Sequence, residues 1–351
     1  MIDADAINQY LDSDKFTVEL SEPTSTRQIV LNTSSDILSE KDVRVALQHA
    51  TNKQNISDGI FYGLEKPADT LFASTIPYCD IKLEPYAYNL ELAGQILDDA
   101  GWKMGSGNVR EKDGQQLNID LLYNSDSVTE KSIAEYLQSE YQSIGVSLNI
   151  HGEEEQSYRD NMKAGNFDMV FNICWGTPYD PQSSLAAMRA PVYGDYAAQL
   201  GLDDKAEIDD AITEILVTTD EDRRQELYTY VLTHLHEDAV YIPLTYECNK
   251  AIYRSDMKGF HFTQTQYEVH SRISLSKRTC HLMLTSPQFK SNVRETWRVI
   301  LSAKLTYSYQ NHCASLRSVI SVGEWTPTEI KVCCYVPMAL PQLPPVFVKC
   351  A

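Results

Sequence analysis

Two aromatic side chains follow a buried strand in the stretch FNICWGTPYDP, residues 171–181. Trp175 and Tyr179 stand where Gly176 and two prolines direct the chain out of a sheet, because neither residue type continues a strand well. Rigid aromatic rings on a loop that leaves a strand end are a common way to build one wall of a ligand pocket. The alternative for Trp175 is a core residue that covers a sheet edge.

An arginine follows this loop in the stretch SLAAMRAP, at Arg189. Its planar guanidinium can bond both oxygens of a carboxylate at once, so an arginine near an aromatic loop suits recognition of an acidic group. The other interpretation is a structural ion pair with one of the many acidic residues of this chain. The sequence leaves both interpretations open.

No residues form a recognisable pattern for catalysis or for a metal site made by protein alone. The sequence has no GxSxG elbow and no phosphate-binding loop, and Cys174 has no evident base beside it. His234 and His236 are two residues apart on a predicted helix, so they point to different faces. Cys333 and Cys334 are adjacent, without the two-residue spacing of a zinc site. We expect no catalytic residues, no metal ligands and no cofactor.

Strands and helices alternate along the part of the chain that must position these side chains. Strands are predicted over 27–32, 117–123, 146–151, 168–173 and 240–246, and helices over 128–144, 154–164, 205–218 and 220–237. The order strand, helix, strand, helix, strand within 117–173 is a βαβαβ unit. We therefore expect an α/β fold with a mostly parallel sheet flanked by helices.

Charge and composition change along the chain. The net charge is −19, yet residues 274–351 hold nine Lys/Arg against three Asp/Glu, and five of the eight cysteines. We expect an aberrant C-terminal tail here; a small separate domain is the alternative. The acidic body argues against nucleic acid as a partner, because phosphates need clustered cations. The start MIDADAINQY lacks a basic segment followed by an apolar one, so no signal peptide is expected in this chain.

Seven stretches, taken together and in order, resemble one protein family. They are VRVALQHATNKQNI, ADTLFASTIPY, NLELAGQILDDAGW, REKDGQQLNIDLLY, IAEYLQSEYQSIGVSLNI, CWGTPYDP and LHEDAVYIPLTY. Over residues 10–273 they are similar to the carboxy-terminal lobe of the solute-binding proteins of peptide and nickel ABC importers. Within that family the likeness is greatest to the nickel-binding branch.

The resemblance implies a periplasmic-binding-protein-like lobe over residues 1–273, with the amino-terminal lobe missing. The tail over 274–351 lies outside the resemblance, and its composition predicts that it is poorly folded. It implies an extracytoplasmic protein, periplasmic or lipid-anchored, that binds a solute without catalysis and delivers it to an ABC permease. The ligand would be nickel bound to a small organic chelator, or a related small solute or peptide. The alternatives are an oligopeptide-binding protein of the same family and a non-catalytic protein-interaction module.

The resemblance also implies which residues contact the ligand. In nickel-type members the tryptophan and tyrosine of WGxPYDP line the chelate site, whereas peptide-binding members carry an aspartate where this chain has Pro178. A histidine that contacts the metal in nickel-type members lies where this chain has Tyr193, so recognition of a nickel chelate, or of another one, stays open. The predicted ligand contacts are Trp175, Thr177, Tyr179, Arg189 and Tyr193.

The family buries its ligand between two lobes that close about a hinge. Because this chain is expected to supply one lobe, it offers half of the contacts. We therefore expect the chain by itself to bind weakly or not at all.

Overall fold

The computed structural model describes residues 4–175, 181–262 and 269–275 of the 351-residue chain. These residues form two compact units. The larger comprises 4–12, 18–252 and Phe262, and the smaller comprises 13–17, 253–261 and 269–275. Within the described ranges, the helices are too short or too polar to cross a membrane. The predicted tail lies almost wholly outside these ranges and stays a prediction.

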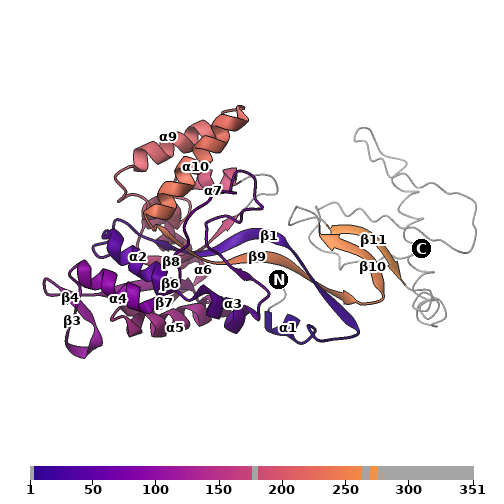
Figure 1. The fold of residues 1–351 in the computed structure, drawn as a ribbon, viewed down its shortest axis with the longest axis horizontal. Helices are drawn as coiled ribbons and strands as arrows, with labels where there is room; N and C mark the ends of the chain where they lie inside the picture. The colour runs from indigo at the N-terminus through magenta and orange to yellow at the C-terminus, as the bar shows by residue number, and fades with distance from the viewer. Residues whose placement is uncertain (1–3, 176–180, 263–268, 276–351) are drawn as a thin grey trace, which may run out of the picture. The chain divides into compact units, whose positions relative to one another are not determined.

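The larger unit is an α/β fold in which helices cover both faces of a six-stranded sheet (Figure 1). The sheet strands are β1 (Phe16–Leu31), β2 (Lys66–Pro67), β6 (Asn118–Asn124), β7 (Ser147–Glu153), β8 (Met169–Trp175) and β9 (Tyr241–Arg254). The helices are α1 (Ala4–Asn8), α2 (Lys41–His49), α3 (Lys53–Phe61), α4 (Leu90–Asp99), α5 (Val128–Ser143), α6 (Glu155–Ala164), α7 (Gln182–Ala187), α8 (Gly194–Ala198), α9 (Lys205–Ile215) and α10 (Glu221–Glu237).

Two small sheets accompany the main one. A three-stranded sheet of β3 (Lys103–Met104), β4 (Arg110–Lys112) and β5 (Gln115–Gln116) lies between α4 and β6 in the chain. The strands β10 (Met257–Phe262) and β11 (Val269–Leu275) pair with each other.

The main sheet has the order β2-β9-β1-β8-β6-β7 and mixed strand directions. β6 pairs in parallel with both β7 and β8, which confirms the predicted βαβαβ unit. β1 is antiparallel to β8, and β2 is antiparallel to β9. The prediction of a mostly parallel sheet is therefore wrong outside these three strands. Local patterns do not encode the direction in which distant segments such as β1 and β9 join a sheet.

Alternate residues of the strands enter two hydrophobic cores, one on each face of the sheet. Ile29 and Leu31 of β1 pack with residues of α2, α4 and α5, whereas Val30 between them packs with residues of α6, α9 and α10. This alternation follows from the two-residue period of a strand. The sheet is therefore the middle layer of three, and the end of β8 lies at the edge of both cores.

The bounds of α5 show how local sequence positions an element near the end of β8. The side chain of Ser127 caps the helix by accepting a hydrogen bond from the amide of Glu130. The helix ends before Gly145, whose φ of 84° suits the left-handed turn that closes it. A strand, a capped helix and a second strand thereby place the amino end of α5 beside the carboxyl end of β6.

Candidate functional site

Trp175 is the last residue of β8, and 46% of its surface is exposed. This exposure excludes the alternative of an enclosed core residue. Ser184 of α7 donates a hydrogen bond from Oγ to the carbonyl oxygen of Trp175 at 2.6 Å, which holds the start of α7 against the strand end. The indole is therefore presented to solvent from a strand end that is fixed by hydrogen bonding.

The antiparallel ladder between β1 and β8 defines the neighbours of Trp175. Ser25 is its partner across the ladder, and Arg27 is the partner of Ile173. Directly opposed residues leave the same face of a sheet, so Ser25 and Arg27 share the face of Trp175. Farther along, this face carries Ile29 and is buried. The hydrophobic core therefore gives way to polar residues as the strands approach Trp175.

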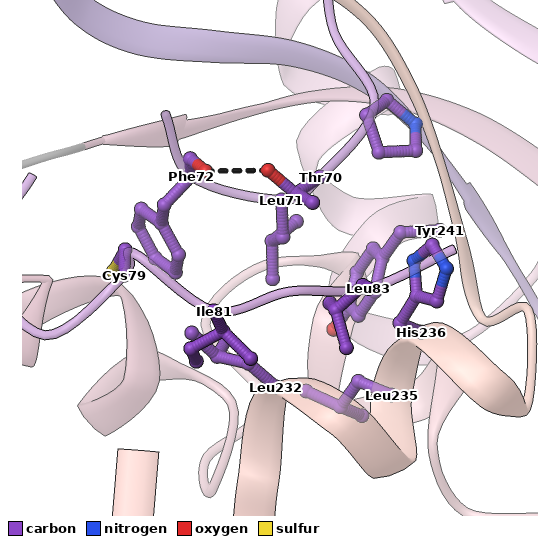
Figure 2. A pocket seen from close by; sticks show the side chains of 11 residues that line it. Thr70, Leu71, Phe72, Cys79, Ile81, Leu83, Leu232, Leu235, His236 and Tyr241 are labelled. Atoms are coloured by element: carbon purple, nitrogen blue, oxygen red, sulfur yellow. Dashed lines mark hydrogen bonds between the residues drawn. The ribbon is translucent and has the colours of Figure 1, made fainter. Parts of the chain in front are cut away.

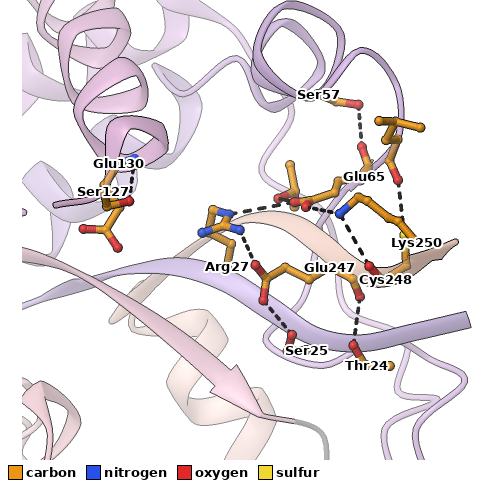
Figure 3. Close-up of polar contacts among 12 residues, drawn as sticks. Thr24, Ser25, Arg27, Ser57, Glu65, Ser127, Glu130, Glu247, Cys248 and Lys250 are labelled. Atoms are coloured by element: carbon orange, nitrogen blue, oxygen red, sulfur yellow. Dashed lines mark hydrogen bonds and ion pairs between the residues drawn. The ribbon is translucent and has the colours of Figure 1, made fainter. Parts of the chain in front are cut away.

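Four charged residues that contact one another beside Arg27 form what we call the charged cluster: Arg27, Glu65, Glu247 and Lys250 (Figure 3). Their side chains are only 2–11% exposed. Lys250 Nζ lies 2.8 Å from Glu65 Oε1, and Arg27 forms an ion pair with Glu247. Ser25 Oγ donates to Glu247 Oε2 at 2.7 Å, which connects the cluster to the residue opposite Trp175.

The charged cluster is neutral overall, because two cations face two carboxylates. Arg27 Nε lies 3.8 Å from Glu65 Oε2. The guanidinium carbon Cζ of Arg27 also lies 5.2 Å from the centre of the Phe61 ring. These cations are therefore already paired inside the protein. The cluster can fix the geometry of β1 and β9 next to Trp175, but it does not present a free cation to an acidic ligand.

Acidic groups gather where the parallel strands end. Glu130 Oε2 accepts a hydrogen bond from the amide of Asn124, the last residue of β6, at 2.9 Å. Burial raises the pKa of Glu130, and the hydrogen bond from Asn124 and the positive charge of Arg27 oppose that shift. Glu155 at the start of α6 bonds the side chains of Asn124 and Arg159. The carboxyl edge of the sheet, where α/β folds commonly bind ligands, is thus acidic beside an exposed indole.

Arg189 lies just after α7 and is partly buried. Its Nη1 donates to Thr213 Oγ1 of α9 at 2.7 Å, and its Nε is buried with no hydrogen-bond partner among the described residues. The alternative interpretation of Arg189, a structural ion pair with an acidic residue, finds no such pair in the described ranges. Arg189 joins α7 to α9, and no hydrogen bond within those ranges connects it to Trp175 or Tyr193.

Tyr193 precedes α8 and is 42% exposed, so its ring is accessible. Its neighbour Val192 is 44% exposed as well. The structure thus places Trp175 and Tyr193 at the surface and Arg189 in a structural contact. The other two predicted ligand contacts, Thr177 and Tyr179, lie outside the described residues, and their roles stay predictions.

Within the described ranges, no three His, Cys, Asp or Glu side chains are grouped to hold a metal ion. His234 Nε2 lies 3.9 Å from Asp204 Oδ2, and His236 Nε2 lies 2.9 Å from the carbonyl oxygen of Glu84. The two imidazoles therefore have different neighbours. Cys174 is 3% exposed, and its burial raises the pKa of the thiol well above its ordinary value. It is a buried thiol rather than an activated nucleophile.

Two hollows lie away from Trp175. A small apolar cavity of about 20 Å³ lies between the segment 70–83, α10 and β9 (Figure 2). It has room for about one water molecule. A polar hollow of about 550 Å³ runs along β6 and β7. Two of its carboxylates are hydrogen-bonded inside the protein: Asp168 Oδ2 accepts from the amide of Asp120, and Asp120 Oδ1 accepts from Asn149 Nδ2. Neither hollow includes a predicted ligand contact.

Sequence reasoning missed the charged cluster. A charged residue at the start of the apolar run RQIVLN, residues 27–32, was the available signal, because a cation in a buried strand needs a partner. The partners Glu65 and Glu247 lie 38 and 220 positions away in the chain, so no local pattern identifies them.

Comparison with known proteins defines the class. Residues 1–195 match the family model of bacterial extracellular solute-binding proteins, family 5 Middle, and the chain belongs to this family. The nickel-binding periplasmic protein of Escherichia coli is 40% identical to it over 247 residues, which are 70% of this chain and 47% of that protein. Heme-binding protein A of Haemophilus influenzae is 25% identical over 252 residues, 70% of this chain and 44% of that protein.

Solved structures agree with the fold. NikA from Brucella suis in complex with Fe(III)-EDTA has a TM-score of 0.75 and 41% identity, covering 78% of this chain and 56% of that one. NikZ from Campylobacter jejuni in complex with Ni(L-His) has a TM-score of 0.62 and 22% identity, covering 77% and 54%. The resemblance to this family and a periplasmic-binding-protein-like α/β fold are thereby confirmed. The chain spans about half the length of the relatives it matches.

Proposed function

We propose that this chain is the ligand-contacting lobe of an ABC-importer solute-binding protein that takes nickel, or a related metal ion, as a complex with a small organic chelator. It would act outside the cytoplasm and deliver the chelate to a membrane permease, without catalysis. The lobe would extend over residues 1–273. The 40% identity to a nickel-binding periplasmic protein and the likeness to a structure that holds Fe(III)-EDTA support the ligand class.

The observation that carries the proposal is the exposed indole of Trp175 at a strand end fixed by Ser184 and bordered by Ser25. A flat apolar ring can cover the carbon skeleton of a chelator, while the ion's charge is met by the chelator itself. The proposed contacts are Trp175, Thr177, Tyr179, Arg189 and Tyr193. The paired charges of the charged cluster and the acidic carboxyl edge argue against a bare anion as ligand.

A titration of the full chain with Fe(III)-EDTA, with nickel plus L-histidine and with a tripeptide tests the proposal. The indole N–H signal of Trp175, assigned with Trp175→Phe, is the readout in NMR. We expect a chelate to shift this signal at a concentration up to about 1 mM, and the tripeptide to shift it less. Stronger binding of the tripeptide would support the oligopeptide alternative instead. A chelate that shifts backbone amide signals but leaves the Trp175 indole signal unchanged, or an equal chelate affinity measured from those amide signals in Trp175→Ala, would overturn the proposed site.

A further inference from the structure

A buried carboxylate, Asp195, lies in the first turn of α8, two residues after Tyr193, and is 6% exposed. Its Oδ2 accepts a hydrogen bond from Asn172 Nδ2 at 2.7 Å. Asn172 lies on β8, three residues before Trp175. This bond therefore connects the helix that follows one proposed ligand contact to the strand that ends in another.

Neutral groups complete the surroundings of Asp195. The hydroxyl of Tyr241 on β9 lowers the pKa of this carboxyl against the larger effect of burial, and it accepts a hydrogen bond from Gln199 Nε2 at 2.6 Å. Among the described residues, Asp195 forms no ion pair with a Lys, Arg or His. A carboxylate buried without a cation binds a proton more readily than an exposed one.

Among Asp195 and the groups around it, Asp195 is the one whose charge changes at a pH closest to 7. Burial raises its pKa to about 6. The titratable groups that face it are Tyr241 from β9 and Cys174 from β8, with Cys79 of the irregular segment beyond Cys174. Burial raises the pKa of Tyr241 and of Cys174 well above their ordinary values, so both stay neutral while Asp195 titrates.

Spare hydrogen-bond acceptors lie beside this network. Gln28 is fully buried opposite Asn172 in the β1–β8 ladder, and neither of its amide atoms has a partner within the described part of the chain. The same holds for Gln199 Oε1. A protonated carboxylic acid becomes a donor and needs an acceptor, which these amide oxygens can supply. Two hydrogen-bond arrangements are therefore available, one for each protonation state.

Tight packing connects this network to Tyr193. A Cβ atom on Gly194 would lie 3.1 Å from Val170 Cγ1, so the start of α8 lies directly on β8. The other end is held because the amide of Thr33 donates to the carbonyl oxygen of Ala198 at 2.9 Å. α8 has only five residues and is held at both ends. We therefore expect a change at Asp195, in its first turn, to reach Tyr193, the residue just before the helix.

We propose that Asp195 is a positioning residue whose protonation adjusts the ligand-contacting surface. As a carboxylate it holds α8 and Tyr193 to the end of β8. As the neutral acid it donates to a glutamine oxygen, and Tyr193 and Trp175 take a second arrangement. The effect on ligand binding rests on the proposed function, whereas the change in arrangement needs no ligand.

The test without ligand follows the Trp175 indole signal of the full chain by NMR between about pH 5 and pH 8. We expect an inflection near pH 6 in the wild type. It should be absent in Asp195→Asn and present in Asp203→Asn, which alters an exposed carboxylate of the loop after α8. An inflection that survives in Asp195→Asn, or a wild-type signal that does not titrate, would overturn the inference.

A second variant keeps the test decisive if Asp195→Asn fails to fold. Tyr241→Phe retains the ring but removes a donor that favours the charged form, so the inflection should move to higher pH. An unchanged midpoint would overturn the inference.

Binding separates this inference from the proposed function. For each protein, the affinity for Fe(III)-EDTA is measured at pH 5.5 and at pH 7.5. We expect the ratio of the two affinities to be at least about threefold larger in the wild type than in Asp195→Asn. If the indole titrates but no chelate binds, the proposed function fails and the positioning role stands. If chelate binds with the same pH dependence in both proteins, the coupling of Asp195 to the site is overturned.

Discussion

Ser25 of β1 lies directly opposite Trp175 of β8 in an antiparallel ladder, and Ser25 is 5% exposed whereas Trp175 is 46% exposed. One strand pair thus carries a buried hydroxyl and an accessible indole side by side. Ser25 bonds Glu247 of the charged cluster, so the exposed ring is supported by a buried polar contact. The strand end is held by hydrogen bonds, and the indole that it carries is open to solvent.

Trp175→Ala should weaken chelate binding with little effect on folding. Loss of a ring that covers the ligand should cost about 2 kcal/mol of binding free energy, roughly 30-fold in affinity for Fe(III)-EDTA. The free energy of unfolding should change by less than about 1 kcal/mol, because the ring is half exposed. NMR titration and urea unfolding measure the two effects. The control is Trp102→Phe, at a tryptophan 2% exposed, which should reduce stability and preserve affinity.

Arg27→Met should destabilise the protein by roughly 3–5 kcal/mol, because it leaves Glu247 buried without its cation. The double variant Arg27→Met with Glu247→Leu should lose less than the single one, since the pair of Lys250 and Glu65 remains balanced. Urea unfolding of both variants provides the comparison. Additive losses would show that the two residues do not act as a pair.

Arg110→Met should cost roughly 3–5 kcal/mol of unfolding free energy. This side chain donates to the carbonyl oxygens of Ile144 at 2.7 Å, Trp102 at 2.6 Å and Gly94 at 3.1 Å, and to Asp98 at 2.9 Å. It thereby joins α4 to the end of α5. Lys103→Met is the matched control, because Lys103 is exposed and also contacts Asp98. A similar cost for both variants would mean that the buried carbonyl contacts contribute nothing.

Asp195 should make the wild type less stable as pH rises from about 4 to about 7, relative to Asp195→Asn. Its pKa is raised from 3.8 to about 6 in the folded state, so the folded protein binds a proton that the unfolded chain releases. The stabilisation is complete below the unfolded value and is lost as pH rises through the folded value, by roughly 3 kcal/mol in total. Urea unfolding of both proteins across this range gives the difference. A constant difference would contradict the raised pKa.

Much of the fold followed from the sequence because its signals are local. The helix predicted over 128–144 is α5, Val128–Ser143, and the strand predicted over 168–173 is β8, Met169–Trp175. β1 was predicted over 27–32 but runs over Phe16–Leu31. The part before the predicted start, FTVELSEPTST, is polar and partly exposed, so no apolar run marks it. Strand order and direction were not predictable, since they arise from contacts between distant segments such as Leu31 and Val240.

The site was predictable only in part. The aromatic residue at the strand exit was found from Gly176 and the prolines that end the strand, and Trp175 is indeed exposed. The environment of Arg189 was not found, because its partner Thr213 lies on another helix. The charged cluster and Asp195 were missed for the same physical reason: a buried ionisable group is recognised by what surrounds it in space.

β1 delivers Val30 to one core and its neighbours Ile29 and Leu31 to the other. Both layers of helices therefore pack on the same strand. Unfolding of β1 removes packing from both layers at once. The larger unit should accordingly melt in a single cooperative step, with calorimetric and van't Hoff enthalpies equal, and a proline at position 30 should abolish both layers together.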